Sequence, residues 1–299
     1  MSHWPPNVTP LPPRRPEWIK VRPLTAEAAQ LRQLLDAQRL HTVCEEARCP
    51  NRNECWRGGT ATFLILGEVC TRACRFCAVR HGRPEPLDGA EPERVVAAAR
   101  LMGLRHVVVT SVDRDDLPDG GAGVFAAVIR RLRAELPECT VEVLVPDFRG
   151  RVAALEEVIA ARPHVLGHNI ETVPRLFRAL MPQSRYHWSQ TVLVAAKERA
   201  AHILTKSGLM VGLGETAEEV VATLTDLRAW GVDIVTVGQY LPPSRQHWPL
   251  ARYYTPEEFQ TLRAFARDEL KFGWVECAPL VRSSYRAAMA VEALRGGGR

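Results

Sequence analysis

The stretch ATFLILGEVCTRACRFCAV, residues 61–79, places three cysteines directly after a predicted β-strand. The apolar run at 61–66 has the length and composition of a buried strand. Cys70, Cys74 and Cys77 follow it with the spacing C-x3-C-x2-C. In barrel-type α/β folds, active sites lie in loops of this kind, at the carboxyl ends of the strands. Three thiolates so spaced can hold three irons of a [4Fe–4S] cluster and leave one iron open to a ligand.

A structural zinc site is the alternative for this loop. Zinc sites prefer paired C-x2–4-C hooks completed by a fourth Cys or His, and His81 is available as that ligand. The loop contains one tight C-x2-C pair, so its spacing favours iron and sulfur over zinc. A redox dithiol would require only two of the three cysteines.

A second set of three cysteines lies upstream, in CEEARCPNRNEC at residues 44–55. Cys44, Cys49 and Cys55 have the spacing C-x4-C-x5-C, and the proline and asparagine content predicts a loop rather than a helix. Three zinc ligands completed by His41, or simply reduced thiols, are the alternatives. Two sets of three cysteines, neither with an obvious fourth ligand, favour a second cluster. In a cytosolic chain of this size, grouped cysteines indicate metal more often than disulfides.

Downstream of residue 60, short apolar runs alternate with amphipathic stretches. Strands are predicted at 61–66, 106–112, 140–145, 164–170, 208–213 and 233–240. Helices are predicted at 91–102, 122–136, 151–161, 189–201 and 216–230, with an earlier one near 25–40. This alternation predicts βαβ units and a parallel sheet, but it does not distinguish a barrel from a doubly wound sheet.

Two helix starts have strong signals. Thr216 with Glu219 forms a capping-box pattern, and Thr255 is followed by Pro256 and Glu258. The tail from residue 272 predicts a strand, a turn and a last helix. Residues 1–23 are rich in proline, which predicts an extended arm.

The composition is that of a globular α/β protein. The chain has 299 residues, of which 46% are hydrophobic and 24% charged. No apolar run is long enough to cross a membrane, and the first residues lack the apolar core of a secretory signal. We therefore expect a cytoplasmic protein with no membrane partner. The net charge is +5, but the basic residues are dispersed, so no nucleic-acid partner is expected.

The spacing of the downstream cysteines, with Phe76 just before the last of them, resembles the signature loop of the radical S-adenosylmethionine (SAM) superfamily. The upstream C-x4-C-x5-C and the RSSY motif at 282–285 narrow the resemblance to the lipoyl synthase family. The similarity extends from about Leu40 to about Ala287, through HTVCEEARCPN, TSVDRDDLPDGGA, HNIETV, TKSGLMVGLGE, GQYLPPSRQHWPL and VRSSYRA.

The resemblance implies a partial (β/α)6 TIM-like barrel with N- and C-terminal extensions. On this basis residues 1–59 are an N-terminal arm and auxiliary-cluster segment, 60–271 the radical SAM barrel, and 272–299 a C-terminal extension with the RSSY motif.

Two scattered cysteines, Cys139 and Cys277, lie in apolar contexts and are expected to be core residues.

The resemblance also implies two [4Fe–4S] clusters. Cys70, Cys74 and Cys77 would hold the catalytic cluster, whose open iron takes the amino and carboxylate groups of SAM. The auxiliary cluster would be held by the upstream set of Cys44, Cys49 and Cys55. Its fourth ligand in the family is a serine of the C-terminal motif. Ser284 is the expected ligand and Ser283 the competing assignment.

The implied reaction inserts sulfur at C6 and C8 of a protein-bound N6-octanoyl-lysine and gives lipoyl-lysine. No general base can remove these unactivated hydrogens, so a cofactor has to supply the difficult step. In the family, reductive cleavage of SAM gives methionine and a 5′-deoxyadenosyl radical that abstracts hydrogen. The auxiliary cluster is the sulfur donor and is consumed, and two SAM molecules are spent.

Residues that follow other predicted strands are candidates for binding SAM. The superfamily pattern suggests the amino group for Ser111 and Asp113, and ribose or methionyl contacts for Asn169 and Glu171. The motif GLMVGLGE at 208–215 matches the region near the adenine. Further candidates are the signature aromatic and two residues of that motif, namely Phe76, Gly212 and Glu215.

Each of these candidates has a structural alternative. The glycines of the motif could simply form the turn before Thr216, and the acidic stretch at 113–116 could be a solvated loop. His168, between apolar neighbours, is expected to be a hydrogen-bonded core histidine rather than a ligand. The segment GQYLPPSRQHWPL could shape the substrate entrance or form a rigid turn. Arg282 and Arg286 could orient the serine loop or meet an acidic carrier.

The expected partners are octanoylated lipoyl carrier domains, either of 2-oxo acid dehydrogenase E2 subunits or of the glycine-cleavage H protein. An electron donor such as flavodoxin or ferredoxin and an iron–sulfur carrier protein are also implied. A methylthiotransferase acting on RNA is the nearest rival, but it would require an RNA-binding module and a basic stripe. A zinc-binding interaction protein is the rival from another class, and a ferredoxin-like carrier would not need so long a chain.

Overall fold

The computed structural model describes residues 14–20, 23, 25, 26, 29, 32, 33, 41–46 and 49–296. The predicted helix near 25–40 therefore lies mostly outside the described residues. Within the described part, no helix is long and apolar enough to cross a membrane.

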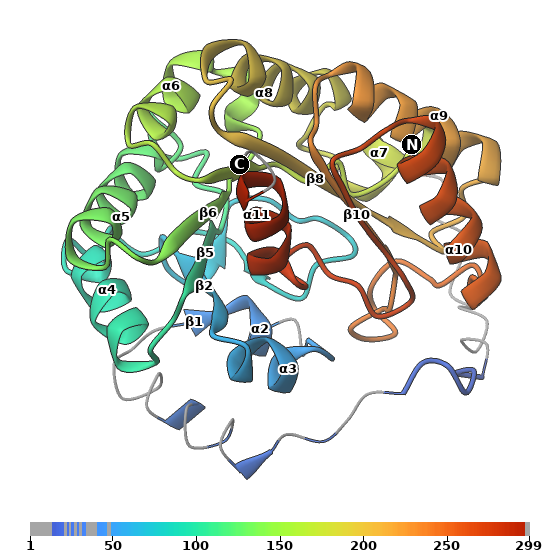
Figure 1. Ribbon diagram of the computed structural model, residues 1–299, viewed down its shortest axis with the longest axis horizontal. Helices are drawn as coiled ribbons and strands as arrows, with labels where there is room; N and C mark the ends of the chain where they lie inside the picture. Colours follow the sequence, from blue (N-terminus) through green and yellow to red (C-terminus); the bar gives the residue numbers. More distant parts are fainter. Residues whose placement is uncertain are drawn as a thin grey trace.

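The sheet follows the order of the chain, which identifies the fold as a barrel (Figure 1). Its eight strands are parallel except for the first, β1 (His41–Thr42), which pairs antiparallel with β2. The parallel strands, in spatial order, are β2 (Thr60–Ile65), β5 (His106–Ser111), β6 (Thr140–Leu144), β7 (Val165–Gly167), β8 (Leu204–Val211), β9 (Ile234–Gln239) and β10 (Trp274–Cys277). A doubly wound sheet would reverse direction part-way. Since β2 and β10 are not paired, the barrel is open, and the predicted partial barrel is confirmed.

The tail contributes a parallel strand beyond the six predicted. β10 pairs with β9 over Trp274–Cys277, so the predicted strand of the tail continues the barrel sheet. A separate two-stranded ribbon of β3 (Val69–Cys70) and β4 (Arg80–His81) forms the base of the cysteine loop. Cys139 and Cys277 are both buried, as predicted for core residues.

A ring of helices packs around the outside of the sheet (Figure 1). It comprises α4 (Glu91–Leu101), α5 (Ala122–Glu135), α6 (Val152–Ala160), α7 (Pro174–Leu180), α8 (Tyr186–Arg199), α9 (Ala217–Ala229) and α10 (Pro256–Ala264). Both predicted helix starts are confirmed, and each is a capping box in which Thr216 or Thr255 accepts from the backbone N–H of Glu219 or Glu258. α7 was not predicted, because seven residues are too few to show a helical period. Two irregular turns complete the ring, η1 (Phe148–Gly150) and η2 (Phe265–Glu269).

The upstream cysteine segment is partly helical, so the prediction of a loop over 44–55 was wrong in part. It contains the short helices α2 (Val43–Glu46) and α3 (Arg52–Arg57). Pro50 lies between the two, where its missing N–H breaks no helical hydrogen bond. The Asn51 side chain donates to the carbonyl of Leu280, 2.6 Å away, which ties this segment to the C-terminal extension.

The last helix, α11 (Ala287–Gly296), closes the barrel at its amino-terminal end. Ala290 and Val291 pack with Val165 and Ile234, the first residues of β7 and β9. Figure 1 shows α11 inside the ring of outer helices. The opposite end, where the cysteine loop follows β2, is thereby left for the site.

Candidate functional site

The downstream cysteines line a cavity at the carboxyl ends of the strands, and we call it the SAM-side cavity. Its lining includes five of the predicted SAM contacts, and the predicted residues in it come from three separate segments of the chain. The predicted residues in its wall are Cys70, Cys74, Cys77, Phe76, Ser111, Asp113, Asn169 and Glu171.

The cysteine loop is held on one side by the second strand-end loop and by the end of α7. The Thr71 N–H donates to the carbonyl of Asp113 over 3.0 Å. The Ala73 N–H donates to Gln183 Oε1 over 3.0 Å, and the Arg75 N–H to the carbonyl of Leu180 over 2.9 Å.

The segment GQYLPPSRQHWPL holds the same loop from the other side. His247 Nε2 lies 3.1 Å from the carbonyl of Cys77, and the Trp248 N–H donates to the carbonyl of Arg75 over 2.8 Å. The Trp248 indole N–H also donates to the carbonyl of Leu213, 2.9 Å away. The segment therefore connects the cysteine loop to the turn after β8, a contact that neither of its two predicted roles describes.

Arg72, between the first two cysteines of the loop, was missed by sequence reasoning. Its guanidinium makes paired hydrogen bonds to Asp115, both 2.8 Å, and to Asp147, 2.9 and 2.7 Å. Asp113 lies 3.4 Å away, and the Ser184 hydroxyl donates to Asp147. Although burial raises the pKa of Asp147, these hydrogen bonds bring it below its usual value. The acidic stretch at 113–116 is thus an anchor for the cysteine loop, and nothing in the sequence spacing pairs Arg72 with it.

The SAM-side thiols have hydrogen-bond donors suited to a bound cluster. Cys70 Sγ accepts the backbone N–H groups of Arg72 and Asp113, at 3.4 and 3.3 Å. Burial raises the pKa of Cys70 to about 12, with a further contribution from the Asp113 charge. Iron–sulfur clusters are tuned by hydrogen bonds of this kind to their sulfurs, so the loop fits such a group.

Other polar atoms in the wall lack partners. Among the described residues, no hydrogen-bond partner is present for the buried Ser111 Oγ or Asn169 Oδ1. Glu171 has a left-handed backbone, φ 64°, and burial raises its pKa to about 7. Its N–H donates to Gly208 and its carbonyl accepts from Met210. A polar ligand with amino and hydroxyl groups would satisfy such a wall.

Two predicted SAM contacts, Gly212 and Glu215, line neither of the cavities described. Gly212 has φ 99°, and a Cβ there would lie 2.2 Å from Gln239 Nε2, which explains the glycine. The Glu215 carboxylate accepts the N–H groups of Gly212 and Leu213, at 2.6 and 2.8 Å. Both residues therefore build the turn after β8. His168 lies 2.9 Å from the Val145 carbonyl and 2.8 Å from Ser189 Oγ, as expected for a core histidine.

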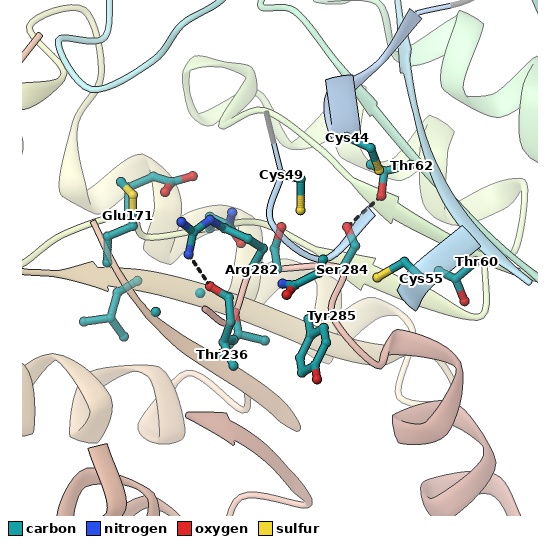
Figure 2. A pocket seen from close by; sticks show the side chains of 18 residues that line it. Cys44, Cys49, Cys55, Thr60, Thr62, Glu171, Thr236, Arg282, Ser284 and Tyr285 are labelled. Atoms are coloured by element: carbon teal, nitrogen blue, oxygen red, sulfur yellow. Dashed lines mark hydrogen bonds between the residues drawn. The ribbon is translucent and has the colours of Figure 1, made fainter. Parts of the chain in front are cut away.

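The upstream cysteines line a second cavity, the auxiliary cavity (Figure 2). Burial raises the pKa of Cys44 to about 11, and the nearby Cys49 raises it further. Burial also raises the pKa of Cys55, with contributions from both other thiols. The three sulfurs are thus close enough to repel one another as thiolates, and a cationic group with several irons would relieve that repulsion.

The two serines of the C-terminal motif occupy different positions. Ser284 lines the auxiliary cavity, where its Oγ accepts from the Thr62 hydroxyl over 2.9 Å (Figure 2). Ser283 lines both cavities. The two cavities also share Asn169 and Glu171, so they adjoin. No three His, Cys, Asp or Glu side chains in the described part of the chain are grouped closely enough to hold a single metal ion.

The chain is similar to radical SAM proteins and, among them, to lipoyl synthases. A family model for the radical SAM superfamily matches residues 64–227. The lipoyl synthase of Rubrobacter xylanophilus is 56% identical over 284 residues, which cover 95% of this chain and 88% of that protein. The lipoyl synthase of Roseiflexus sp. is 53% identical, covering 94% of this chain and 93% of that protein.

Solved structures share the fold at low sequence identity. The [FeFe]-hydrogenase maturase HydG from Carboxydothermus hydrogenoformans superposes with a TM-score of 0.56 at 16% identity, covering 91% of this chain and 78% of that one. Methylornithine synthase gives a TM-score of 0.53 at 15% identity, covering 86% and 79%.

Proposed function

The chain belongs to the lipoyl synthase family of the radical SAM superfamily, and from that premise we propose how its residues divide the reaction between the two cavities. The enzyme uses SAM and two [4Fe–4S] clusters to insert two sulfur atoms into a protein-bound octanoyl-lysine, at C6 and C8. This division of the reaction is supported by one observation. Each set of three thiols lines its own cavity, and the two cavities share Asn169, Glu171 and Ser283.

Cys70, Cys74 and Cys77 are the ligands of the catalytic cluster. With SAM bound, that cluster supplies the hydrogen-abstracting chemistry that no side chain offers for an unactivated C–H bond. The chain's own task is to keep the cysteine loop fixed. It does so through Arg72 and through the hydrogen bonds to the end of α7 and to Trp248.

SAM contacts are assigned to Phe76, Ser111, Asp113, Asn169 and Glu171. The unpartnered oxygens of Ser111 and Asn169 and the buried carboxyl of Glu171 support this assignment. Gly212 and Glu215 act indirectly, by shaping the turn to which Trp248 is bound.

The ligands of the auxiliary cluster are Cys44, Cys49, Cys55 and Ser284. The position of Ser284 beside Thr62, within the auxiliary cavity alone, supports it over Ser283. A hard oxygen ligand is a poorer match than thiolate for this iron, so it is the ligand best suited to leave when the sulfur donor is opened.

The octanoyl chain is assigned to the junction of the two cavities. The walls of the auxiliary cavity include the apolar Leu209, Met210 and Val281, which suit an acyl chain. The acceptors would be lipoyl carrier domains of 2-oxo acid dehydrogenase E2 subunits or the glycine-cleavage H protein. Flavodoxin or ferredoxin would supply electrons, an iron–sulfur carrier protein would rebuild the donor, and the setting would be cytoplasmic.

This division assigns the segments of the chain to separate tasks. Residues 60–271 form most of the barrel with the SAM-side cavity, while 1–59 and 272–299 contribute the auxiliary ligands, and 272–299 also adds the last barrel strand, β10. The hydrogen bonds from Asn51 to Leu280 and from Thr62 to Ser284 support a single auxiliary site built from both extensions and β2.

Ser284→Ala is expected to reduce sulfur insertion at least about 10- to 100-fold, the cost of losing even a group that only supports a metal ligand. Formation of 5′-deoxyadenosine should continue, because Ser284 does not line the SAM-side cavity. Both products are measured by mass spectrometry after anaerobic reconstitution. Ser283→Ala is the matched control, with a smaller loss of insertion. The reverse result would assign the ligand to Ser283.

His247→Ala is expected to reduce 5′-deoxyadenosine formation about fivefold. It removes one hydrogen bond to the cysteine loop, at Cys77, and such a bond contributes about 1 kcal/mol. The rate at low and saturating SAM is the measurement. His202→Ala, at an exposed position, is the control. An unchanged rate at both concentrations would show that the segment does not position the loop.

A further inference from the structure

Arg282 is held rigidly in the wall of the auxiliary cavity. A Cβ at Gly238 of β9 would lie 2.1 Å from the Val281 carbonyl oxygen, so the chain beside Arg282 packs directly on the strand. The Gln239 N–H donates to the carbonyl of Pro279 over 3.2 Å, and Asn51 donates to Leu280. The backbone on the amino side of Arg282 is therefore fixed from two sides.

The guanidinium of Arg282 extends into the cavity rather than towards solvent. Figure 2 shows it between Cys49 and Glu171, on the side away from Ser284. Its one hydrogen bond among the described residues goes to the adjacent Val281 carbonyl, 2.7 Å from Nη1. No carboxylate of the described residues lies within ion-pair distance of it.

The neighbouring arginines are differently placed. Arg52 lies over the Trp56 ring and 3.7 Å from Glu45. Arg286 lies over the Tyr285 ring, 3.9 Å from Glu54, with 44% of its side chain exposed. Arg282 is thus the arginine of this region that lines the cavity of the three thiols, nearest to Cys49, with no carboxylate of the described residues within ion-pair distance.

A cation in this position requires a physical reason. Guanidinium stays protonated in proteins, and Arg282 is half-buried, so a charge withdrawn from water there without an acidic partner is unfavourable. The same cavity collects three thiols and a serine, which become anionic when they ligate iron. One fixed positive charge beside these groups attracts each of them and so offsets their mutual repulsion.

We propose that Arg282 is the counter-charge of the auxiliary cluster. It is a positioning residue that stabilises the anionic ligands and raises the reduction potential of the cluster that these ligands hold. The inference rests on the proposed function, because it needs a cluster at Cys44, Cys49 and Cys55. A nearby positive charge favours the more negative, reduced state, and the net charge and surroundings of a cluster set its potential.

The test uses the full chain with Cys70, Cys74 and Cys77 replaced by alanine, so that iron signals come from the auxiliary site. Arg282→Met removes the charge at similar length, Arg282→Lys keeps the charge, and Arg286→Met is the exposed control. After anaerobic reconstitution, we would measure the midpoint potential by redox titration with electron paramagnetic resonance, and the rate of iron loss to a chelator.

We expect Arg282→Met to shift the potential to a more negative value and to release iron about tenfold faster, in the range for groups that support a metal site. Arg282→Lys and Arg286→Met should remain near the parent protein. Equal potentials and release rates in Arg282→Met and the parent would overturn the inference. So would equal losses in the Lys and Met variants, because charge would then not be the cause. A parent that binds no cluster would instead contradict the proposed function.

Discussion

Replacing Cys70, Cys74 and Cys77 together by alanine is expected to abolish 5′-deoxyadenosine formation and, with it, all sulfur insertion. These thiols line the SAM-side cavity with the proposed SAM contacts, and no other cysteine of the described residues lines it. The two products are measured by mass spectrometry in one anaerobic reaction containing SAM, a reductant and an octanoyl-lysine peptide.

Replacing Cys44, Cys49 and Cys55 by alanine is the matched experiment and should separate the two activities. These residues line the auxiliary cavity and not the SAM-side cavity. We therefore expect 5′-deoxyadenosine to form while no sulfur enters the peptide. Sulfur insertion by the upstream variant would contradict the assigned sulfur donor. If both variants lost 5′-deoxyadenosine formation alike, the division between the cavities would be wrong.

Arg72→Met is expected to lower the free energy of unfolding by about 3–5 kcal/mol, the cost of removing one partner from a buried ion pair. The side chains of Arg72 and Asp147 are 4% and 1% exposed and lie 2.7 Å apart. Without Arg72, Asp147 keeps one described hydrogen-bond donor from a side chain, the Ser184 hydroxyl. Asp115 loses its paired bonds. The measurement is equilibrium urea unfolding under reducing, anaerobic conditions.

Two variants control for the charge and for the loss of any arginine. Arg72→Lys keeps the charge but loses the fork that bonds two carboxylates at once, so an intermediate loss is expected. Arg131→Met removes an arginine that is 49% exposed and 3.4 Å from Glu135, where about 0.5 kcal/mol or less is expected. Equal losses for Arg72→Met and Arg131→Met would show that the buried network does not stabilise the fold.

The sequence was most informative where the chemistry is local. The spacing of the three cysteines at 70–77 places them in a single loop, and this loop follows a strand with a clear apolar run. The capping boxes at Thr216 and Thr255 likewise depend on residues three apart. Such features depend only on residues that are close together in the sequence, so they could be predicted.

Features that depend on contacts between distant segments could not be predicted. The carboxylates around Arg72 come from separate loops, and nothing in the spacing pairs them. The bond from Asn51 to Leu280 joins residues 229 positions apart. Glu215 follows a family pattern, yet its carboxylate is bound to the turn itself. The helices within 44–55 were missed because the prediction relied on the proline and asparagine content of the segment. Helices this short are stabilised by tertiary packing, which composition does not report.

Sulfur insertion by this enzyme is tested most directly in an anaerobic reaction of the reconstituted protein with SAM, a reductant and an octanoyl-lysine peptide, analysed by mass spectrometry. We expect a peptide in which two hydrogens are replaced by two sulfurs, together with 5′-deoxyadenosine. Accumulation of 5′-deoxyadenosine with an unchanged peptide would contradict the assigned sulfur donor and substrate.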